Sequence, residues 1–211
     1  MFVGHYGPSL AAKAAKNPIP LWILFVAVQL LDVFWSIFVL LGIEKVRIAP
    51  GITATNPLDL YYMPYTHSLL GAMLWSIAAG VAYYVFRRAE GWSAGAIVGA
   101  AVLSHWVLDW FVHRPDLPLY DNSFKVGLGL WNHPAFAFTL EIAVLFGGMG
   151  LYMKTVGMVW LGVFVMHPLL RALTWHGPRR RATGKIRRRM ICCPQNGRFP
   201  SEDGLAPQSS T

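Results

Sequence analysis

The stretch Leu103–His113, LSHWVLDWFVH, places three ionisable side chains inside an otherwise apolar segment. His105, Asp109 and His113 are spaced four residues apart, so on a helix they share one stripe. Ionisable side chains are costly in lipid and usually face a partner or a water-filled cavity. The stretch therefore predicts a helix of a membrane bundle with an inward polar face. Imidazole and carboxylate groups on that face suit Zn²⁺ or another divalent cation.

The composition of the whole chain agrees with a polytopic membrane protein. Of its 211 residues, 55% are hydrophobic and 13% are charged, whereas about a quarter of the residues in a soluble domain are charged. Spanning helices need roughly 20 apolar residues, and we expect an all-α bundle of four or five of them plus a short helix over residues 3–16. The expected spans are residues 21–43, 68–87, 94–112 and 136–153. A shorter fifth run at 157–170 is broken by His167 and Pro168, and it is a span, a re-entrant piece or an interfacial helix. Residues 44–67 and 113–135, which are rich in turn-forming residues, are expected to be loops.

The chain divides into a membrane-embedded domain, residues 1–176, and a basic tail, residues 177–211, that we expect to be disordered. The net charge of +8 is concentrated in this tail, which fits a cytoplasmic segment or a patch on anionic lipid. Nucleic-acid binding is not expected, because the cluster lacks interleaved aromatic residues and a reading motif. The two cysteines are neighbours in the tail, which excludes a cysteine-rich zinc site among the apolar runs.

Further polar residues interrupt the other apolar runs. If the chain turns at Pro18–Pro20, His5 and Asp32 each lie about thirteen residues from that turn, or roughly 20 Å into the bilayer. His105 reaches roughly 16 Å from the same face, and His67 opens another helix at the opposite side. The polar groups thus converge on one half of the bilayer. The simpler interpretation is a structural hydrogen-bonded pair of His105 and Asp109. For Asp59, Asp116 and Asp121 it is turn capping.

These residues resemble the membrane-bound metal-dependent hydrolase family, also described as LexA-binding, inner-membrane-associated hydrolases. The matching motifs are His5 in GHYGPSLAAK, Asp32 in QLLDV, YTHSLLG at Tyr65–Gly71 and SHWVLD at Ser104–Asp109. The resemblance spans about residues 3–135. The chain departs from the family before THS, where a His-Arg pair is absent, and at Asp32, which lacks the preceding Pro and a following acidic residue. A distant similarity of the family to zinc-dependent phospholipases C implies phosphoester chemistry.

The motifs and the resemblance together predict an inner-membrane hydrolase that uses one or more divalent metals to activate water, with zinc as the expected metal. Its substrate would be lipid-derived or a phosphoester, and membrane lipid its partner. His113 or Glu141 would accept or return the proton. The expected metal ligands are His5, Asp32, His67, His105 and Asp109. Three rivals remain open: a proton-relay transporter or channel, a non-catalytic membrane protein with a structural metal, and an adaptor that binds a cytosolic partner through its tail.

Overall fold

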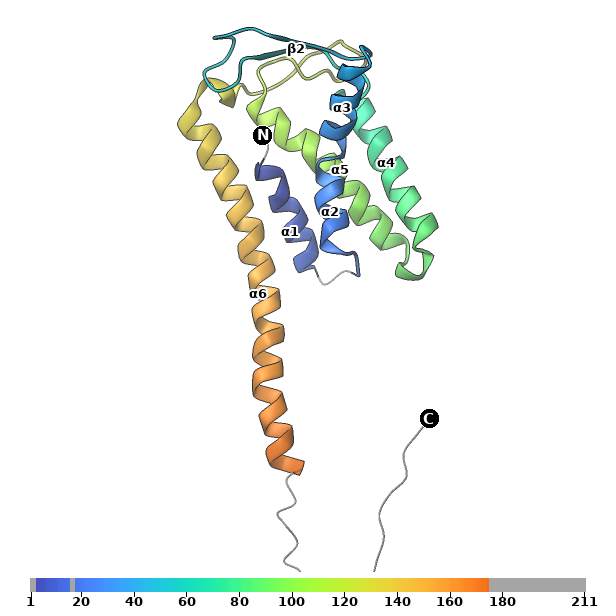
Figure 1. Ribbon diagram of the computed structural model, residues 1–211, viewed down its shortest axis with the longest axis vertical. Helices are drawn as coiled ribbons and strands as arrows, with labels where there is room; N and C mark the ends of the chain where they lie inside the picture. Colours follow the sequence, from blue (N-terminus) through green and yellow to red (C-terminus); the bar gives the residue numbers. More distant parts are fainter. Residues whose placement is uncertain (1–2, 16–17, 175–211) are drawn as a thin grey trace, which may run out of the picture.

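The computed structural model describes residues 3–15 and 18–174, with side chains described as far as residue 157. This part of the chain is mostly helical, with one two-stranded antiparallel sheet (Figure 1). The helices are α1 (Tyr6–Ala14), α2 (Leu21–Val28), α3 (Leu30–Leu40), α4 (Leu69–Phe86), α5 (Trp92–Val112) and α6 (Pro134–Thr174); the strands are β1 (Lys45–Ile48) and β2 (Leu58–Tyr62), and 3-10 turns lie at Val3–His5, Arg88–Glu90 and Leu130–Asn132.

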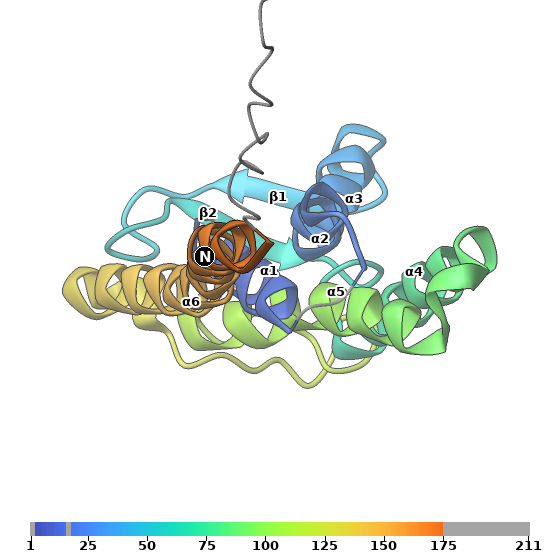
Figure 2. The same cartoon turned by 90° about the horizontal axis from the view of Figure 1, so that it is seen from below.

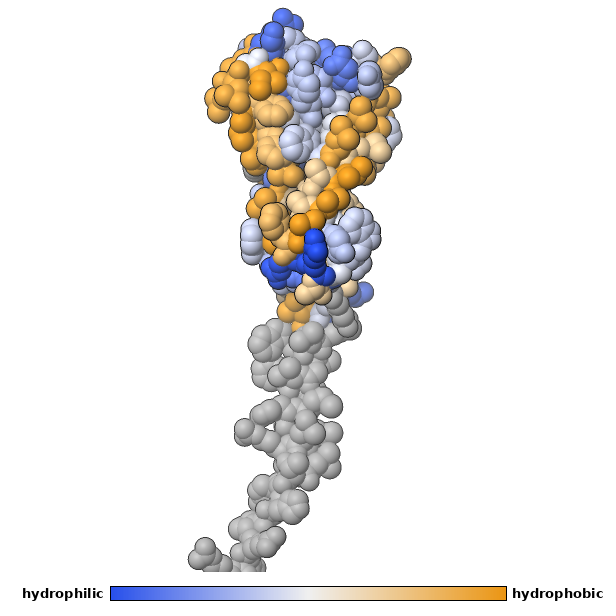
Figure 3. All heavy atoms as spheres, turned by 90° about the vertical axis from the view of Figure 1, so that its right-hand side faces the viewer, coloured by the Kyte–Doolittle hydropathy of each residue, from blue (hydrophilic) through white to orange (hydrophobic). Residues whose placement is uncertain are grey.

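Three helices are long and apolar enough to cross a membrane: α4, α5 and the Pro134–Gly157 part of α6. The bent pair α2 and α3 makes a fourth if it is counted as one span. On one face of the molecule, apolar and weakly polar residues lie between two strongly hydrophilic patches, one at the top of the view and one below it (Figure 3). The described chain thus holds three or four such segments, whereas four or five were expected; the two numbers agree only if the bent pair is one span.

The fifth apolar run does not form an element of its own. Residues 157–170 continue α6, which runs unbroken for 41 residues from Pro134 to Thr174. A helix of this length extends about 60 Å, roughly twice the thickness of a hydrocarbon core. The sequence around His167 and Pro168 indicated a break, but the backbone stays helical there.

The first apolar run is broken in its middle. The axes of α2 and α3 differ by 48° across Gln29, although no Pro or Gly lies in the run from Leu21 to Leu40. A helix end leaves its last carbonyl groups without intrahelical partners. The carbonyl of Val28, the last residue of α2, accepts a hydrogen bond of 2.7 Å from His105 Nδ1. The break therefore gives α5 a backbone acceptor inside the bundle.

Residues 41–68 and 113–133 form a cap over one end of the helices (Figure 1). The sequence indicated loops here, and the sheet of β1 and β2 shows that the fold is not strictly all-α. Arg47 pairs with Asp59 across the sheet, and Arg114 pairs with both Asp59 and Asp116. These ion pairs join the sheet to the segment that follows α5. Asp59 and Asp116 are therefore buried partners of arginine, and turn capping does not describe their contacts.

Small residues allow close contacts between helices. A Cβ atom added to Gly95 of α5 would lie 2.6 Å from the carbonyl oxygen of Gly80 in α4, so the two backbones touch. Such contacts through glycine are typical of helix pairs in membranes. α1 lies between α6 and α2 in Figure 1, and Figure 2 shows it next to α6 in the view from below. There Gly7 of α1 meets Gly148 of α6, and any Cβ on either would overlap the other helix's backbone.

Replacing Gly148 with valine should push α1 away from α6 and lower the free energy of unfolding in detergent. Overpacking of this kind costs about 1–3 kcal/mol. Gly147→Val is the matched control, because a Cβ there meets no atom within 4 Å. Thermal unfolding of both purified variants tests the contact, and equal midpoints would contradict it.

Candidate metal centre

Four buried or half-buried side chains from two helices and the cap converge on one point: Asp32 of α3, His67 of the cap, and His105 and Asp109 of α5. One ligand atom of each lies within 4.8 Å of the others. The Nε2 atoms of His67 and His105 both lie 3.4 Å from Asp32 Oδ1. The same two nitrogens lie 3.7 and 3.1 Å from Asp109 Oδ2.

These separations match the spacing of ligands around a tetrahedral cation. With Zn–N and Zn–O bonds near 2.0–2.1 Å, two ligand atoms are separated by about 3.3 Å. The buried Nε2 of His105 makes no hydrogen bond, although Asp109 Oδ2 is so close. Two lone pairs facing each other in this way would repel, so the contact calls for a positive charge between them, which either a proton on Nε2 or a metal ion coordinated by both atoms supplies. The cluster can therefore hold a metal ion.

The tautomer of His105 follows from its other ring nitrogen. Nδ1 lies 2.7 Å from the carbonyl oxygen of Val28. Because a carbonyl oxygen only accepts, Nδ1 carries the proton and donates it. The neutral ring then keeps its lone pair on Nε2, the atom that points at Asp32 and Asp109. An outer hydrogen bond of this kind orients the histidine ligands of metals.

A three-residue relay holds His67 in the same way. Glu44 is buried, and its carboxylate accepts hydrogen bonds from the backbone N–H groups of Tyr65 and Thr66. The hydroxyl of Thr66 donates to Glu44 Oε2 at 2.6 Å. Because the hydroxyl has only this one hydrogen to donate, Thr66 Oγ1 acts as the acceptor of the hydrogen bond from Nδ1 of His67, at 2.8 Å. In the neutral ring, Nε2 of His67 then keeps its lone pair and points it at the cluster.

His113 ends α5 and lies at the edge of the cluster. Its Nδ1 donates to Asp116 Oδ1 at 2.9 Å, and its Nε2 lies 3.8 Å from Asp109 Oδ2. Trp131 covers the ring, with 4.2 Å between the two ring centroids. Asp116 is held in turn by Arg114. His113 is thus an oriented imidazole beside the four-residue group rather than one of its members.

His5 touches the cluster from the opposite side. Its ring stacks on His105 with 3.9 Å between centroids, and its Nε2 lies 3.3 Å from Asp109 Oδ1. Neither ring nitrogen of this fully buried residue makes a hydrogen bond. Burial lowers the pKa of His5, and the neighbouring Asp109 carboxylate opposes the shift only in part. The neutral form has the lone pair that a metal ligand needs.

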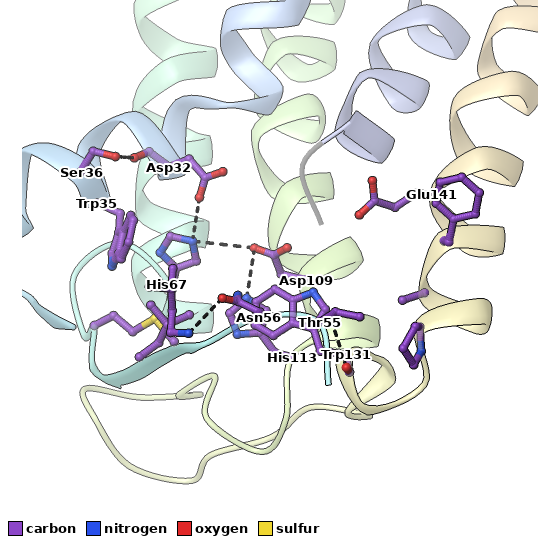
Figure 4. A pocket seen from close by; sticks show the side chains of 16 residues that line it. Asp32, Trp35, Ser36, Thr55, Asn56, His67, Asp109, His113, Trp131 and Glu141 are labelled. Carbon is purple, nitrogen blue, oxygen red and sulfur yellow. Dashed lines mark hydrogen bonds and ion pairs between the residues drawn. The ribbon is translucent and has the colours of Figure 1, made fainter. Parts of the chain in front are cut away.

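A cavity of about 570 Å³ opens beside the cluster. Asp32, His67, Asp109 and His113 line one wall, and Figure 4 shows them pointing toward one another. Glu141 of α6 lines the far wall, apart from these side chains (Figure 4). The cluster is therefore reachable from a space large enough for a small ligand.

The structure brings together the five expected ligands, with His5 in an outer position, and places both expected proton acceptors on the cavity. Sequence reasoning missed Glu44, Thr66 and the Val28 carbonyl, and it assigned Asp116 to a turn. Thr66 had a signal, since it lies inside the THS motif. Glu44 had none, because it lies 22 residues before Thr66. The predicted tail, residues 177–211, lies outside the described residues.

Comparison with known proteins leaves the family assignment as a prediction from motifs. No protein-family model, no curated protein and no solved structure matches the chain.

Proposed function

We propose that this chain is an integral inner-membrane hydrolase that uses a divalent metal, with zinc as the expected metal, to cleave an ester or phosphoester bond. The observation that carries the proposal is the orientation of His67 and His105. Each commits Nδ1 to an acceptor outside the cluster, and each turns Nε2 toward Asp32 and Asp109. A pair of neutral imidazoles and two carboxylates at these separations is a ligand set for a divalent cation.

An open position supports catalysis over a purely structural role. Asp32, His67 and Asp109 all line the cavity. A water or substrate molecule in the cavity can therefore reach the point on which their metal-binding atoms converge. Structural zinc sites are closed, while catalytic ones keep a position for water or substrate. A metal bound here would supply a water of lowered pKa and would polarise the bond under attack.

His113 is the better placed of the two expected proton acceptors. Its Nε2 lies within 3.8 Å of Asp109 and faces the cavity wall, while Asp116 fixes its Nδ1 proton. A proton taken up at Nε2 makes an imidazolium that the Asp116 carboxylate stabilises. Glu141 lies across the cavity on α6, away from the ligand atoms.

The test is metal analysis of the full-length protein purified in detergent, followed by chelation. We expect stoichiometric metal by elemental analysis, together with cleavage of p-nitrophenyl carboxylic or phosphoric esters. Chelation should abolish the cleavage and Zn²⁺ should restore it. A protein without stoichiometric metal contradicts the metal centre. Metal-loaded protein that cleaves neither ester class contradicts the hydrolase and favours a structural site.

A further inference from the structure

The cavity is bounded by α3, by the candidate span of α6 and by the cap. α3 contributes Trp35 and Ser36, and α6 contributes Ala137 and Phe138. Leu58, Leu60 and Met63 form the wall on the cap side. Apart from the cluster side chains, this lining is mainly apolar. In Figure 4, α3 and α6 stand on opposite sides of the cluster. We call the opening between them the α3–α6 cleft.

In a bilayer that α6 crosses from its cap end, the cleft would open at the depth of the hydrocarbon layer. Asp32 lies eight residues before the end of α3 and Glu141 seven residues after the start of α6. At 1.5 Å per residue both are about 10–12 Å from the cap. The side chain of Asp32 is nevertheless 33% exposed, so the cleft reaches the outside there. Exposed apolar side chains continue outward from both walls: Val33 and Ile37 on α3, and Phe136 and Phe138 on α6.

Charge limits the class of ligand. The lining residues include the carboxylates of Asp32, Asp109 and Glu141 and contain no Lys or Arg. A divalent cation would balance Asp32 and Asp109. An ionised Glu141 would then remain inside an apolar helix without an ion-pair partner among the described side chains. Such a charge is costly unless it meets a counter-charge. An ammonium group meets that need, and an anionic headgroup does not.

We propose that the α3–α6 cleft takes a bilayer lipid laterally from the leaflet next to the cap. The headgroup is zwitterionic, its ammonium lies near Glu141, and its acyl chain leaves through the cleft into the membrane. The lipid's ester or phosphoester bond then lies at the metal cluster. This inference rests on the hydrolase function proposed above for its chemistry, but the lipid-binding step can be measured without turnover.

The test uses full-length protein in nanodiscs of phosphatidylethanolamine that contain a phosphatidylethanolamine with a diazirine on its acyl chain. After illumination, labelled residues are mapped by mass spectrometry. We expect label on Met63 and Ala137, which line the cavity and are only 1% and 7% exposed. Lipid that merely surrounds the protein cannot reach these two. Label confined to outward residues such as Phe136 would overturn the proposal.

Two blocking variants and one control sharpen the result. Ala137→Phe and Ser36→Phe fill the cleft from opposite walls and should each lower the labelling of Met63 at least tenfold. Ala135→Phe is the control, since Ala135 is exposed on the same helix and does not line the cavity. Ser36 is also exposed, so its variant tests the cleft without overfilling a buried site. Unchanged labelling of Met63 in both blocking variants contradicts the cleft.

The headgroup has its own comparison. A phosphatidylglycerol diazirine probe should label Met63 several-fold less than the ethanolamine probe in the wild type, and Glu141→Gln should remove the difference. Equal labelling by both probes in the wild type contradicts the role of Glu141. Metal content is measured on the same samples. If Met63 is labelled in protein that holds no metal, the hydrolase proposal fails while the lipid proposal stands.

Discussion

Asp109→Asn should reduce the bound metal to background and lower ester cleavage by at least a hundredfold. Asp109 is the central carboxylate of the site: Oδ2 faces His67, His105 and His113, while Oδ1 faces His5. Asparagine keeps the shape but loses the negative charge, which a divalent cation in a buried site requires. Elemental analysis of the purified variant measures the first effect, and ester cleavage at saturating Zn²⁺ measures the second.

Asp121→Asn provides the matched control for this substitution. Asp121 lies in the cap with φ +48°, a conformation that asparagine adopts readily, and it does not line the cavity. We expect this variant to keep its metal and its activity. Wild-type metal content in Asp109→Asn would show that the cation lies elsewhere. A loss of metal with an unchanged thermal midpoint would place the effect in the site itself.

Thr66→Val should weaken metal binding by about 10–100-fold, the usual effect of losing an outer partner of a ligand. Valine has the size of threonine but lacks the hydroxyl that links Glu44 to His67. Without it, Nδ1 of His67 has no acceptor, and the ring is free to turn or to change its tautomer. Competition with a chromophoric chelator gives the apparent Kd for Zn²⁺ and does not depend on turnover.

Rescue distinguishes this positioning role from simple packing. Thr66→Ser keeps the hydroxyl and should restore most of the affinity, although it removes a buried methyl group. Glu44→Gln should weaken binding like Thr66→Val, because a neutral amide polarises the hydroxyl less. Thr155→Val controls for the loss of a threonine hydroxyl far from the site, on α6. If Thr66→Ser binds zinc as weakly as Thr66→Val, the hydrogen bonds of the relay do not contribute to zinc affinity.

Some features of the fold are encoded locally and could be predicted. The apolar run before His113 forms α5 close to the expected bounds, and Ser68 ends the loop before α4 by accepting a hydrogen bond from Gly71 N. The i, i+4 spacing of His105 and Asp109 puts both on one face, because the period of a helix is local. The expected depth of His5 and Asp32 also anticipated their approach to α5.

Other features depend on contacts that no local pattern encodes. The helix bends at Gln29 although residues 21–40 contain no Pro or Gly from which a bend could be predicted. The cap was expected to be loop, since the sheet of β1 and β2 is only four and five residues long. The prediction of a break near Pro168 was wrong, since α6 continues as a helix from Pro134 to Thr174.

By itself, the sequence determined which segments are apolar helices and which of their side chains are ionisable, because both follow from residue type and short-range spacing. Only the tertiary structure decided which ring nitrogen of each histidine faces the carboxylates. Those choices are made by the Val28 carbonyl, 77 residues from His105, and by Glu44, 22 residues from Thr66. A backbone carbonyl has no side-chain signature, and partners so far apart in the chain meet only when the helices and the cap pack.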